Sequence, residues 1–569
     1  MCTLSVSPGP MNVMQHRCEE SSLVGHKEGE VASGAPPNPV LAYYPSIFND
    51  VIGPVMRGPS SSHCAASVRI GRLARDLMGG EIDEVLIQFD PQGSLATTHS
   101  SQGSDMGLLG GLLGWEATDE RLAESATAIR KAGIRVAIEV TDIGAEHPNT
   151  YKLTLSKRGA QHQLTAISCG GGMVRLTELD GFSVSIAGDY YETLLVPGQN
   201  ADQVIAALLS RTLRETIEAE EILLLSAGHR SLIEIKARKP LPEQVLADLG
   251  TRFGVMGCYR LSPVLPVLSR RQVQVPFHTC QEMLAYDATG GMALWELAAD
   301  YESARAGLTR DEVLQEMSQI VGILQESIRQ GIAGTTYADR ILGYQSGVFA
   351  AKMASSSLLD AGMLNQIILY VTALMEVKSS MGVIVAAPTA GACAGLPGAC
   401  IGAASAMGLD LDDITRAMLA AGMIGVFIAA HSTFAAEVCG CQAECGAGSA
   451  MAAAALVTLA KGTAQQAVDA SSLALKNMLG LICDPVASRV EVPCLGRNVL
   501  AASNALACAN MALAGYDAVI PLDEVIATMD LVGKMLPVEL RCTALGGLSV
   551  TPTSQEIASR LDREGLQRS

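Results

Sequence analysis

The spacing of hydrophobic and polar positions divides the chain into a mixed strand–helix part and a helical part. Residues 84–90 (EVLIQFD) and 135–140 (RVAIEV) alternate apolar and polar side chains, as strands with one buried face do. Between them, residues 121–133 (RLAESATAIRKAG) repeat their apolar positions with helical spacing. This alternation of strands and helices predicts an α/β domain over residues 44–190.

The pattern changes twice after residue 190. Residues 191–260 follow a strand and helix order that resembles a degenerate ACT-type module, although its first turn, PGQNADQ, lacks the Asp-x-Pro-Gly of a ligand-binding ACT domain. Residues 261–279 contain several prolines and are interpreted as a linker, and residues 280–569 are helical apart from loops. Residues 1–43 lack apolar periodicity, which predicts a disordered leader. We therefore predict an α+β protein with an N-terminal α/β domain, a small ACT-like α+β module and a large all-helical C-terminal domain.

Composition limits both the core and the partners. Apolar residues fill 49% of the 569 positions but aromatic residues only 4%, so the core has to consist of small and aliphatic side chains, which suits closely packed helices. A net charge of −18 argues against nucleic acid or an anionic membrane surface as a partner. The longest apolar run, residues 418–430, is too short to span a bilayer and predicts a buried core helix.

Three of the fifteen cysteines stand where helices stop or turns begin. Cys441 follows a glycine, Cys483 precedes Asp-Pro, and Cys494 follows a proline. Thiolates at such positions ligate metals, and three thiolates leave the open position that a Lewis-acid catalyst needs. The alternative is three buried apolar cysteines, which the spacing alone favours because no CxxC-type signature is present. An odd number of cysteines predicts reduced thiols in the cytoplasm instead of a disulfide framework.

The sequence motifs around these cysteines indicate a family. GCQAE, NMLGLICDPV and VEVPCLGRN resemble the α chain of the iron–sulfur-dependent L-serine dehydratases (L-serine ammonia-lyases), as do residues 381–399 (MGVIVAAPTAGACAGLPGA) and 540–553 (LRCTALGGLSVTPT). The resemblance implies that Cys441, Cys483 and Cys494 hold a [4Fe–4S] cluster whose fourth iron is left for substrate. We expect a cytoplasmic homodimer that acts on a small-molecule amino acid and binds neither nucleic acid nor membrane.

Two histidines and a run of serines are the candidate groups in the first part of the chain. Ser60, Ser61 and Ser62 precede a helical pattern, where hydroxyls and backbone N–H groups converge on an anion, and His63 follows at once. The alternative is simple capping of the helix by serine. The words DVIGPV, GPSSSH, GGLLG and EHPNT resemble the β portion of the same dehydratases, which adds His147; its alternative is a turn histidine before a proline. The resemblance thus joins β-like and α-like portions over residues 44–569.

Further side chains complete the predicted site. We expect the three serines, with Thr389 and Lys378, to bind substrate, and His63 or His147 to act as the base or as the acid that assists hydroxide loss. Arg497 and Asn498 directly follow the third cysteine word and are expected to donate to the cluster or the substrate. For these two, helix capping or surface pairing is an equally good interpretation.

Several words depart from the family pattern. The Gly-His-Gly-Thr-Asp of β portions is Ser-Gln-Gly-Ser-Asp at 101–105, Lys378 replaces an asparagine, and an Asn-rich stretch is AHSTF at 430–434. Arg-Glu-Thr becomes Arg-Cys-Thr at 541–543, and Ser-Arg stands at 488–489 where small or apolar residues are usual. The added cations would match an additional acidic group. We hypothesise that the cluster chemistry is retained with a substrate other than plain serine.

The sequence therefore predicts a lyase that converts L-serine to pyruvate and ammonia by Lewis-acid-assisted loss of the 3-hydroxyl. One alternative is β-elimination from another amino acid, such as threonine, cysteine or a larger β-hydroxy amino acid. Another is a catalytically retired regulatory paralogue, which the lost histidine suggests. A pyridoxal-phosphate enzyme is rejected because Lys378 and Lys476 lack the Schiff-base and phosphate-loop context.

Overall fold

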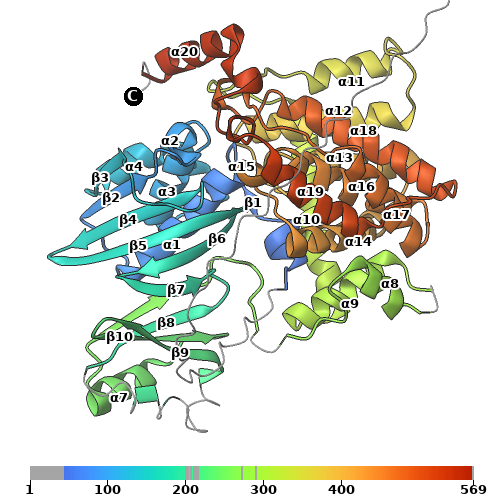
Figure 1. Ribbon diagram of the computed structural model, residues 1–569. Helices are drawn as coiled ribbons and strands as arrows, with labels where there is room; N and C mark the ends of the chain where they lie inside the picture. Colours follow the sequence, from blue (N-terminus) through green and yellow to red (C-terminus); the bar gives the residue numbers. More distant parts are fainter. Residues whose placement is uncertain are drawn as a thin grey trace, which may run out of the picture. The chain divides into compact units, whose positions relative to one another are not determined.

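The computed structural model describes residues 44–198, 204–205, 208, 217–270, 273–288 and 291–566. Over these residues, two β-sheets come first in the chain and a mainly helical region follows (Figure 1). The predicted α+β class is confirmed at this level. The predicted leader, residues 1–43, lies outside the described residues.

The first sheet has six strands in the order β3-β2-β4-β5-β6-β7. Its strands are β2 (Glu84–Phe89), β3 (Arg135–Val140), β4 (Thr150–Lys157), β5 (Ala160–Gly170), β6 (Met173–Leu179) and β7 (Phe182–Ile186). Only β2 and β3 pair in parallel, joined by a helical crossover, and the other neighbours are antiparallel. The strands predicted at 84–90 and 135–140 are confirmed as β2 and β3.

Helices packed at short range cover this sheet. They are α1 (Ala66–Leu77), α2 (Leu95–Thr98), α3 (Ser104–Leu112) and α4 (Ser125–Lys131). Glycines let α1 and α3 touch, because a Cβ at Gly71 would meet the backbone oxygen of Leu108 at 2.5 Å. α1 begins directly after the π-helical turn η2 (Ser61–Ala65), so this tight packing fixes the position of the predicted serine and histidine segment.

The second sheet has four antiparallel strands in the order β11-β8-β10-β9. They are β8 (Tyr191–Val196), β9 (Ala219–Ala227), β10 (Arg230–Ala237) and β11 (Gly257–Leu261), and α7 (Glu243–Phe253) follows β10. Buried Lys236 bridges Glu192 and Glu234 at 3.1 and 2.9 Å inside this part. Much of the helix predicted between β8 and β9 falls outside the described residues, so the ACT-like interpretation stays a prediction.

The helical region supplies most of the core. Its helices are α8 (Cys280–Tyr286), α9 (Leu294–Ala306), α10 (Arg310–Ala333), α11 (Ser346–Ala354), α12 (Met363–Ser379), α13 (Gly395–Met407), α14 (Leu411–His431), α15 (Ala436–Cys439), α16 (Ala447–Leu459), α17 (Ala464–Lys476), α18 (Cys494–Leu513), α19 (Leu522–Met535) and α20 (Pro552–Leu566). Small residues at their contacts allow the close approach that the low aromatic content predicts.

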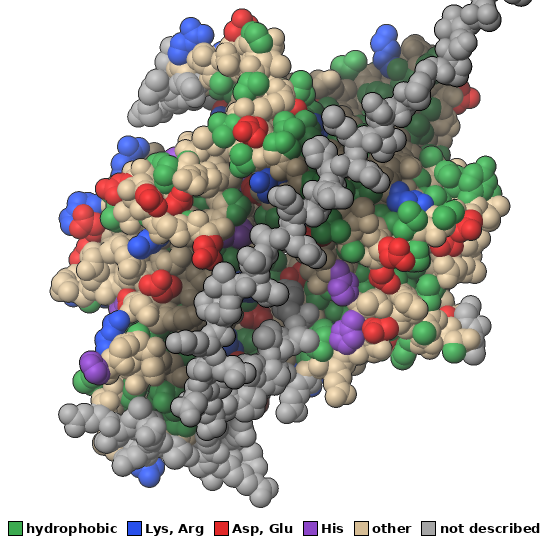
Figure 2. Space-filling model, viewed as in Figure 1, with side chains coloured by type: hydrophobic (Ala, Val, Ile, Leu, Met, Phe, Trp, Pro, Cys, Tyr) green, Lys and Arg blue, Asp and Glu red, His purple; other side chains and the backbone are tan. Residues whose placement is uncertain are grey.

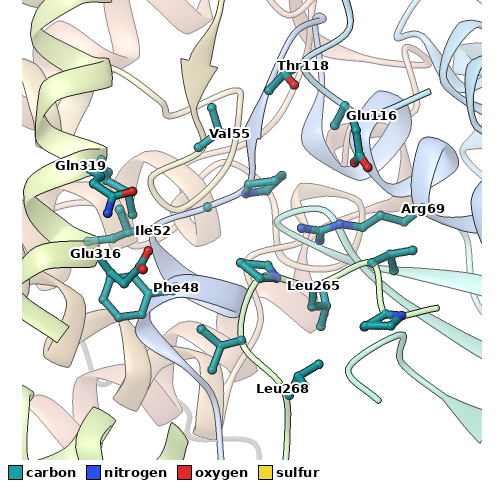
Figure 3. A pocket seen from close by; sticks show the side chains of 18 of the residues that line it. Phe48, Ile52, Val55, Arg69, Glu116, Thr118, Leu265, Leu268, Glu316 and Gln319 are labelled. Carbon is teal, nitrogen blue, oxygen red and sulfur yellow. The ribbon is translucent and has the colours of Figure 1, made fainter. Parts of the chain in front are cut away.

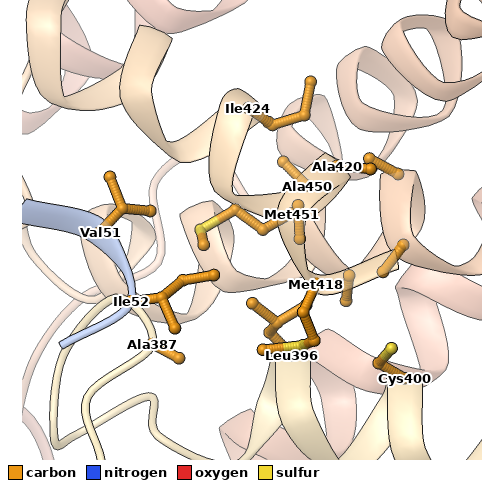
Figure 4. Close-up of a cluster of buried hydrophobic side chains, with 14 of the residues drawn as sticks. Val51, Ile52, Ala387, Leu396, Cys400, Met418, Ala420, Ile424, Ala450 and Met451 are labelled. Atoms are coloured by element: carbon orange, nitrogen blue, oxygen red, sulfur yellow. The ribbon is translucent and has the colours of Figure 1, made fainter. Parts of the chain in front are cut away.

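Helices α14 and α16 form the centre of this core. Figure 4 shows Val51 and Ile52, from the start of the described chain, facing Met451 of α16 across the cluster. Among the described residues, α14 alone is long and apolar enough to cross a membrane, and 78% of its apolar window is buried inside the protein. The prediction of a buried core helix over 418–430 is confirmed.

The all-helical prediction for residues 280–569 is wrong in one detail. Strand β12 (Ile384–Val385) pairs with β1 (Val55–Met56). The backbones of Cys483 and Arg541 form an isolated parallel β-bridge. The β-branched run GVIV favours extended backbone at this point. The β1–β12 pairing matters because it ties the serine segment after β1 to the threonine loop after β12.

Candidate active site

The three predicted cluster cysteines come from three separate elements. Cys441 precedes the π-helical turn η4 (Gln442–Gly446), Cys483 lies in an extended segment after α17, and Cys494 is the first residue of α18. All three side chains are buried. π-Helical turns are rare and occur frequently at functional sites, so the presence of η2 and η4 on either side of this region is informative.

The structure brings these thiols together with two further cysteines. Cys441 Sγ lies 3.7 Å from Cys445 Sγ and also contacts Cys483, which in turn contacts Cys542. Cys494 is close enough to interact electrostatically with Cys441. We call these five residues, Cys441, Cys445, Cys483, Cys494 and Cys542, the thiol cluster.

One sulfur of the thiol cluster is stabilised as a thiolate. Hydrogen bonds that the sulfur of Cys441 shares with Cys445 and Cys483, followed by the positive charge of Arg497, lower the pKa of Cys441 well below its usual value. Burial instead raises the pKa of Cys494. Because the thiolate is the form that ligates metals, Cys441 is prepared for this role.

The thiol cluster fits an iron–sulfur group by its chemistry. Within the described residues, no group of three or more His, Cys, Asp or Glu side chains has the geometry to hold a single metal ion. Thiolates are soft ligands that bind iron–sulfur clusters, zinc and copper(I). In a four-iron cluster each thiolate binds a different iron, so the thiolates do not have to surround one ion. Buried sulfurs delivered by separate elements are therefore suitable donors for a cube.

Asn498 anchors the loop beside the thiol cluster. Its Oδ1 accepts from the backbone N–H groups of Ala394 and Gly395, at 3.2 and 2.8 Å. Its Nδ2 donates to the backbone oxygens of Gly391 and Cys494, at 2.8 and 2.9 Å. A single buried amide thus joins the start of α13, the 391 loop and the start of α18.

Arg497 connects the thiol cluster to the chain after α19. Its Nη2 donates to Asp484 Oδ1 at 2.6 Å, and Asp484 Oδ2 accepts from the backbone N–H of Leu548 at 2.8 Å. The guanidinium also interacts electrostatically with Cys441 and Cys483. Arg497 therefore supplies positive charge next to the sulfurs while its own partner holds the 541–550 segment in place.

His63 is fully buried and both ring nitrogens are engaged. Nδ1 lies 3.0 Å from Ser60 Oγ, and Nε2 lies 2.9 Å from Thr98 Oγ1. Since the Thr98 hydroxyl donates to the backbone oxygen of Ser94, it accepts from Nε2–H, which leaves Nδ1 to accept the Ser60 proton. Burial lowers the pKa of His63 to about 3, with a contribution from His99, so the ring is neutral.

Two buried carboxyls lie at the same place. Glu437 Oε1 is 3.6 Å from His63 Nδ1, and burial raises the pKa of Glu437. Glu444 Oε1 accepts from Thr389 Oγ1 at 2.6 Å, while Glu444 Oε2 lies 3.7 Å from Cys441 Sγ. Burial, followed by the charge of Cys441, raises the pKa of Glu444 well above its usual value. Thr389 and His63 are therefore each joined to the cysteine segment by a carboxyl.

Comparison with known proteins is consistent with both portions of this site. Residues 289–549 match the family model described as serine dehydratase alpha chain. The chain is 37% identical over 253 residues to the probable L-serine dehydratase alpha chain of Bacillus subtilis, covering 44% of this chain and 84% of that one. It is 34% identical over 290 residues to the L-serine dehydratase alpha chain of Peptoniphilus asaccharolyticus, covering 51% of this chain and 99% of that one. The chain belongs to the L-serine dehydratase family.

A match to the second type of family chain shows a fused form. The probable L-serine dehydratase beta chain of Bacillus subtilis is 35% identical over 208 residues, which is 36% of this chain and 93% of that one. Contacts in the structure join the two portions of this family member directly. His63 faces Glu437, and the Ser61 hydroxyl accepts from the backbone N–H of Ala390 at 3.1 Å. The candidate site thus contains residues from both portions of the chain.

The other predicted residues of this dehydratase site are placed as follows. Ser62 is buried in η2 beside Ser61. His147 is partly buried, its Nδ1 accepts from the backbone N–H of Asn149 at 3.1 Å, and burial lowers its pKa. Within the described residues, His147 makes no hydrogen bond to another predicted site residue. Asn149, two positions on, contacts Glu437 and is the nearer link of this segment to the site.

Four residues of the site were missed by the sequence reasoning. Cys445 lies one helical turn after Cys441, a spacing that could have indicated a shared site. Gln102 Nε2 lies 3.6 Å from Cys542 Sγ, so two positions that depart from the family pattern touch each other. Glu437 carried no signal, because its contact with His63 spans the two portions of the chain.

Two of the cavities in the described part of this dehydratase lie nearest to the predicted site segments. The larger, about 670 Å³, is bounded by the 263–268 segment, α10 and the start of α1, and Figure 3 shows Arg69, Glu116 and Glu316 on its walls. None of the predicted site residues lines it. The smaller, about 90 Å³, is lined by Lys378 and by Pro59, the residue before Ser60. The smaller cavity is therefore the one that adjoins the site.

Proposed function

We propose that this protein dehydrates and deaminates L-serine to pyruvate and ammonia. The observation that carries the proposal is the convergence of Cys441, Cys483 and Cys494 at one buried place, beside a serine and histidine segment from the other portion of the chain. Membership of the L-serine dehydratase family supports the same activity.

The cofactor of this reaction is a [4Fe–4S] cluster held by Cys441, Cys483 and Cys494. When bound, it supplies a Lewis acid at its open iron, which stabilises the negative charge on the departing 3-hydroxyl. Arg497 contributes positive charge to the same sulfurs, and Asn498 fixes the first turn of α18, from which Cys494 projects. These two residues orient the ligands without touching the reacting atoms.

The substrate groups have natural partners in the chain. The hydroxyls of Ser60, Ser61, Ser62 and Thr389 are buried at η2 and the 389 loop, and they would hold the α-carboxylate. A base must then take the proton from Cα. His63 fits this role better than His147, because it lies in contact with Ser60 and Glu437. The released enamine tautomerises and hydrolyses without further help from the protein.

The cellular compartment and the oligomeric state are part of the same proposal. The cysteines of the described residues are all free, and thiol ligands persist in a reducing compartment, so we place the enzyme in the cytoplasm. On the face drawn in Figure 2, basic and acidic side chains are both scattered over the described surface. We expect a homodimer, supported by the exposed apolar side chains Leu531 and Met535, one turn apart on α19. Light scattering of the purified protein tests the dimer.

Anaerobic purification tests the activity. The expected result is a brown protein with about four irons and matching sulfide per chain, which forms pyruvate and ammonia in equal amounts from L-serine. A cluster-loaded protein that releases no pyruvate from serine would refute the activity but not the cofactor. Protein that lacks iron even after anaerobic reconstitution would refute the cofactor and would favour the regulatory alternative.

A further inference from the structure

The small cavity next to the site contains an unpaired buried cation. Lys378 lies near the end of α12, its side chain is 1% exposed, and its Nζ has no hydrogen-bond partner. Burying an ammonium group without a partner costs several kcal/mol, and such a group is normally paired. An unpaired ammonium group at a cavity wall is the arrangement that an anionic ligand completes.

The other charged groups of this cavity are already paired. Arg489 Nη2 donates to Asp339 Oδ1 at 2.8 Å. Glu491 accepts from the backbone N–H groups of Ile341 and Leu342, at 2.9 Å each. Their charges are therefore largely compensated in place. Lys378 remains as the cation that is available to a ligand, with the Arg489 guanidinium on the same wall.

The position of the cavity relates it to the reacting centre. Pro59 lines it and directly precedes Ser60, while Val490 and Glu491 line it shortly before Cys494. Lys378 also interacts electrostatically with Cys494. A substrate bound between the serine segment and the thiol cluster could thus place one of its groups in this cavity.

We propose that this cavity binds a second carboxylate of the substrate, carried on Cβ, so that the enzyme dehydrates a β-hydroxy-α-amino dicarboxylic acid such as 3-hydroxyaspartate. This inference rests on the proposed function, because it uses the same reaction at the same site. A volume of about 90 Å³ is enough for a carboxylate, and it is small beside the roughly 300–1,000 Å³ of an ordinary ligand pocket. Chemistry and size together select this substrate class.

The reaction balances without another reactant. The Cα–H bond breaks and its proton goes to the base, the Cβ–O bond breaks and hydroxide leaves as water after protonation, and a Cα=Cβ bond forms. The enamine tautomerises to an imine, and water hydrolyses the imine to ammonia and a 2-oxo acid. The water lost is regained, so 3-hydroxyaspartate gives oxaloacetate and ammonia.

Two unreactive ligands test the second carboxylate directly. L-Aspartate carries both carboxylates and L-alanine only one, and neither has a hydroxyl to lose. Calorimetric titration of the anaerobic holoenzyme should show aspartate binding about 10- to 100-fold more tightly than alanine, the range of a charge-assisted hydrogen bond. Equal dissociation constants, or no binding of aspartate, would overturn the proposal without any variant being made.

Variants assign the effect to Lys378. Lys378→Met keeps length and removes charge, and it should abolish the preference for aspartate while leaving the affinity for alanine within about threefold. Lys352→Met, which removes an exposed lysine on α11, should keep the preference. A preference that survives in Lys378→Met would also overturn the proposal, and would favour a lysine that only neutralises the thiol cluster.

Turnover separates this inference from the proposed function. The specificity constant for 3-hydroxyaspartate should exceed that for L-serine in the wild type, and Lys378→Met should reverse the order. A cluster-loaded enzyme that turns over serine and does not prefer aspartate refutes only the dicarboxylate inference. Protein without cluster or turnover that still prefers aspartate refutes the proposed function, and with it the dehydration of a dicarboxylic acid, but leaves the carboxylate site at Lys378 standing.

Discussion

The thiol cluster and the cavity beside Lys378 adjoin each other but are made of different kinds of side chain. The thiol cluster is made of sulfur and small apolar side chains, and the cation that interacts with Cys441, Arg497, is paired with Asp484. The cavity is lined by charged and hydroxyl side chains as well as apolar ones and keeps one ammonium group unpaired. The first arrangement suits a resident inorganic group. The second suits a ligand that comes and goes.

The two regions also differ in how they relate to the family pattern. The cysteine words are intact, whereas Lys378 and Arg489, both departures from that pattern, lie on one cavity wall. A third departure, Gln102, contacts a fourth, Cys542, which belongs to the thiol cluster but to none of the three cysteine motifs. We infer that the reaction has been kept while the fit of the substrate has changed.

The largest effect should come from removing a predicted cluster ligand. Cys483→Ser should lose most of its iron and lower kcat for L-serine at least about 10³-fold, because a Lewis acid contributes several kcal/mol to the barrier. Iron analysis and pyruvate formation measure the two effects. Cys258→Ser, at an exposed cysteine on β11, is the matched control and should change neither. Full iron content in Cys483→Ser would remove this cysteine from the ligand set.

The second effect concerns proton transfer. His63→Gln should lower kcat about 100-fold or more while leaving iron content unchanged, since general base catalysis typically contributes 10²- to 10⁴-fold. His147→Gln is the matched variant and should reduce kcat less, because His147 does not contact the serine segment. If His147→Gln is the more severe change, the assignment of the two histidines has to be exchanged.

A third effect concerns the anchor of the thiol cluster. Asn498→Ala leaves two buried N–H groups and two buried C=O groups without their side-chain partner. The free energy of unfolding should therefore fall by about 3 kcal/mol. Denaturation of the holoenzyme measures this loss, which should be accompanied by faster release of iron. Asn365→Ala, which removes one solvent-exposed hydrogen bond to the backbone oxygen of Leu359, should lower the free energy of unfolding by less than about 1 kcal/mol. Equal stability of the two variants would contradict the anchoring role.

The smallest effect is a dependence of stability on pH. The pKa of folded His63 is depressed to about 3, so its contribution to stability is complete above the unfolded pKa near 6.5 and is lost as pH falls toward 3. Between pH 6.5 and 5, wild type should lose about 1.5 kcal/mol more than His63→Gln. Glu437, whose pKa is raised, is present in both proteins and cancels in the difference. Parallel stability curves would show that His63 is not buried in its neutral form.

The local sequence pattern predicted the helices and strands better than it predicted the tertiary contacts between them. Strand β2 and helix α14 follow from alternation and from an apolar run, because each is decided within its own residues. The β1–β12 pairing joins residues 55–56 to 384–385 and leaves no local trace in either segment. The same limit explains why Glu437 was missed and why the Gln102–Cys542 contact could not be foreseen. The cysteine motifs predicted three ligands, but only the tertiary structure shows that five thiols gather.

The most direct test is Mössbauer spectroscopy of ⁵⁷Fe-labelled, anaerobically purified enzyme with and without L-serine. If three cysteines hold a four-iron cluster with one open iron, about a quarter of the iron signal should change when serine is added. In Cys441→Ser, the cluster signal itself should disappear. A spectrum that serine leaves unchanged, or a cluster that persists without Cys441, would contradict the account.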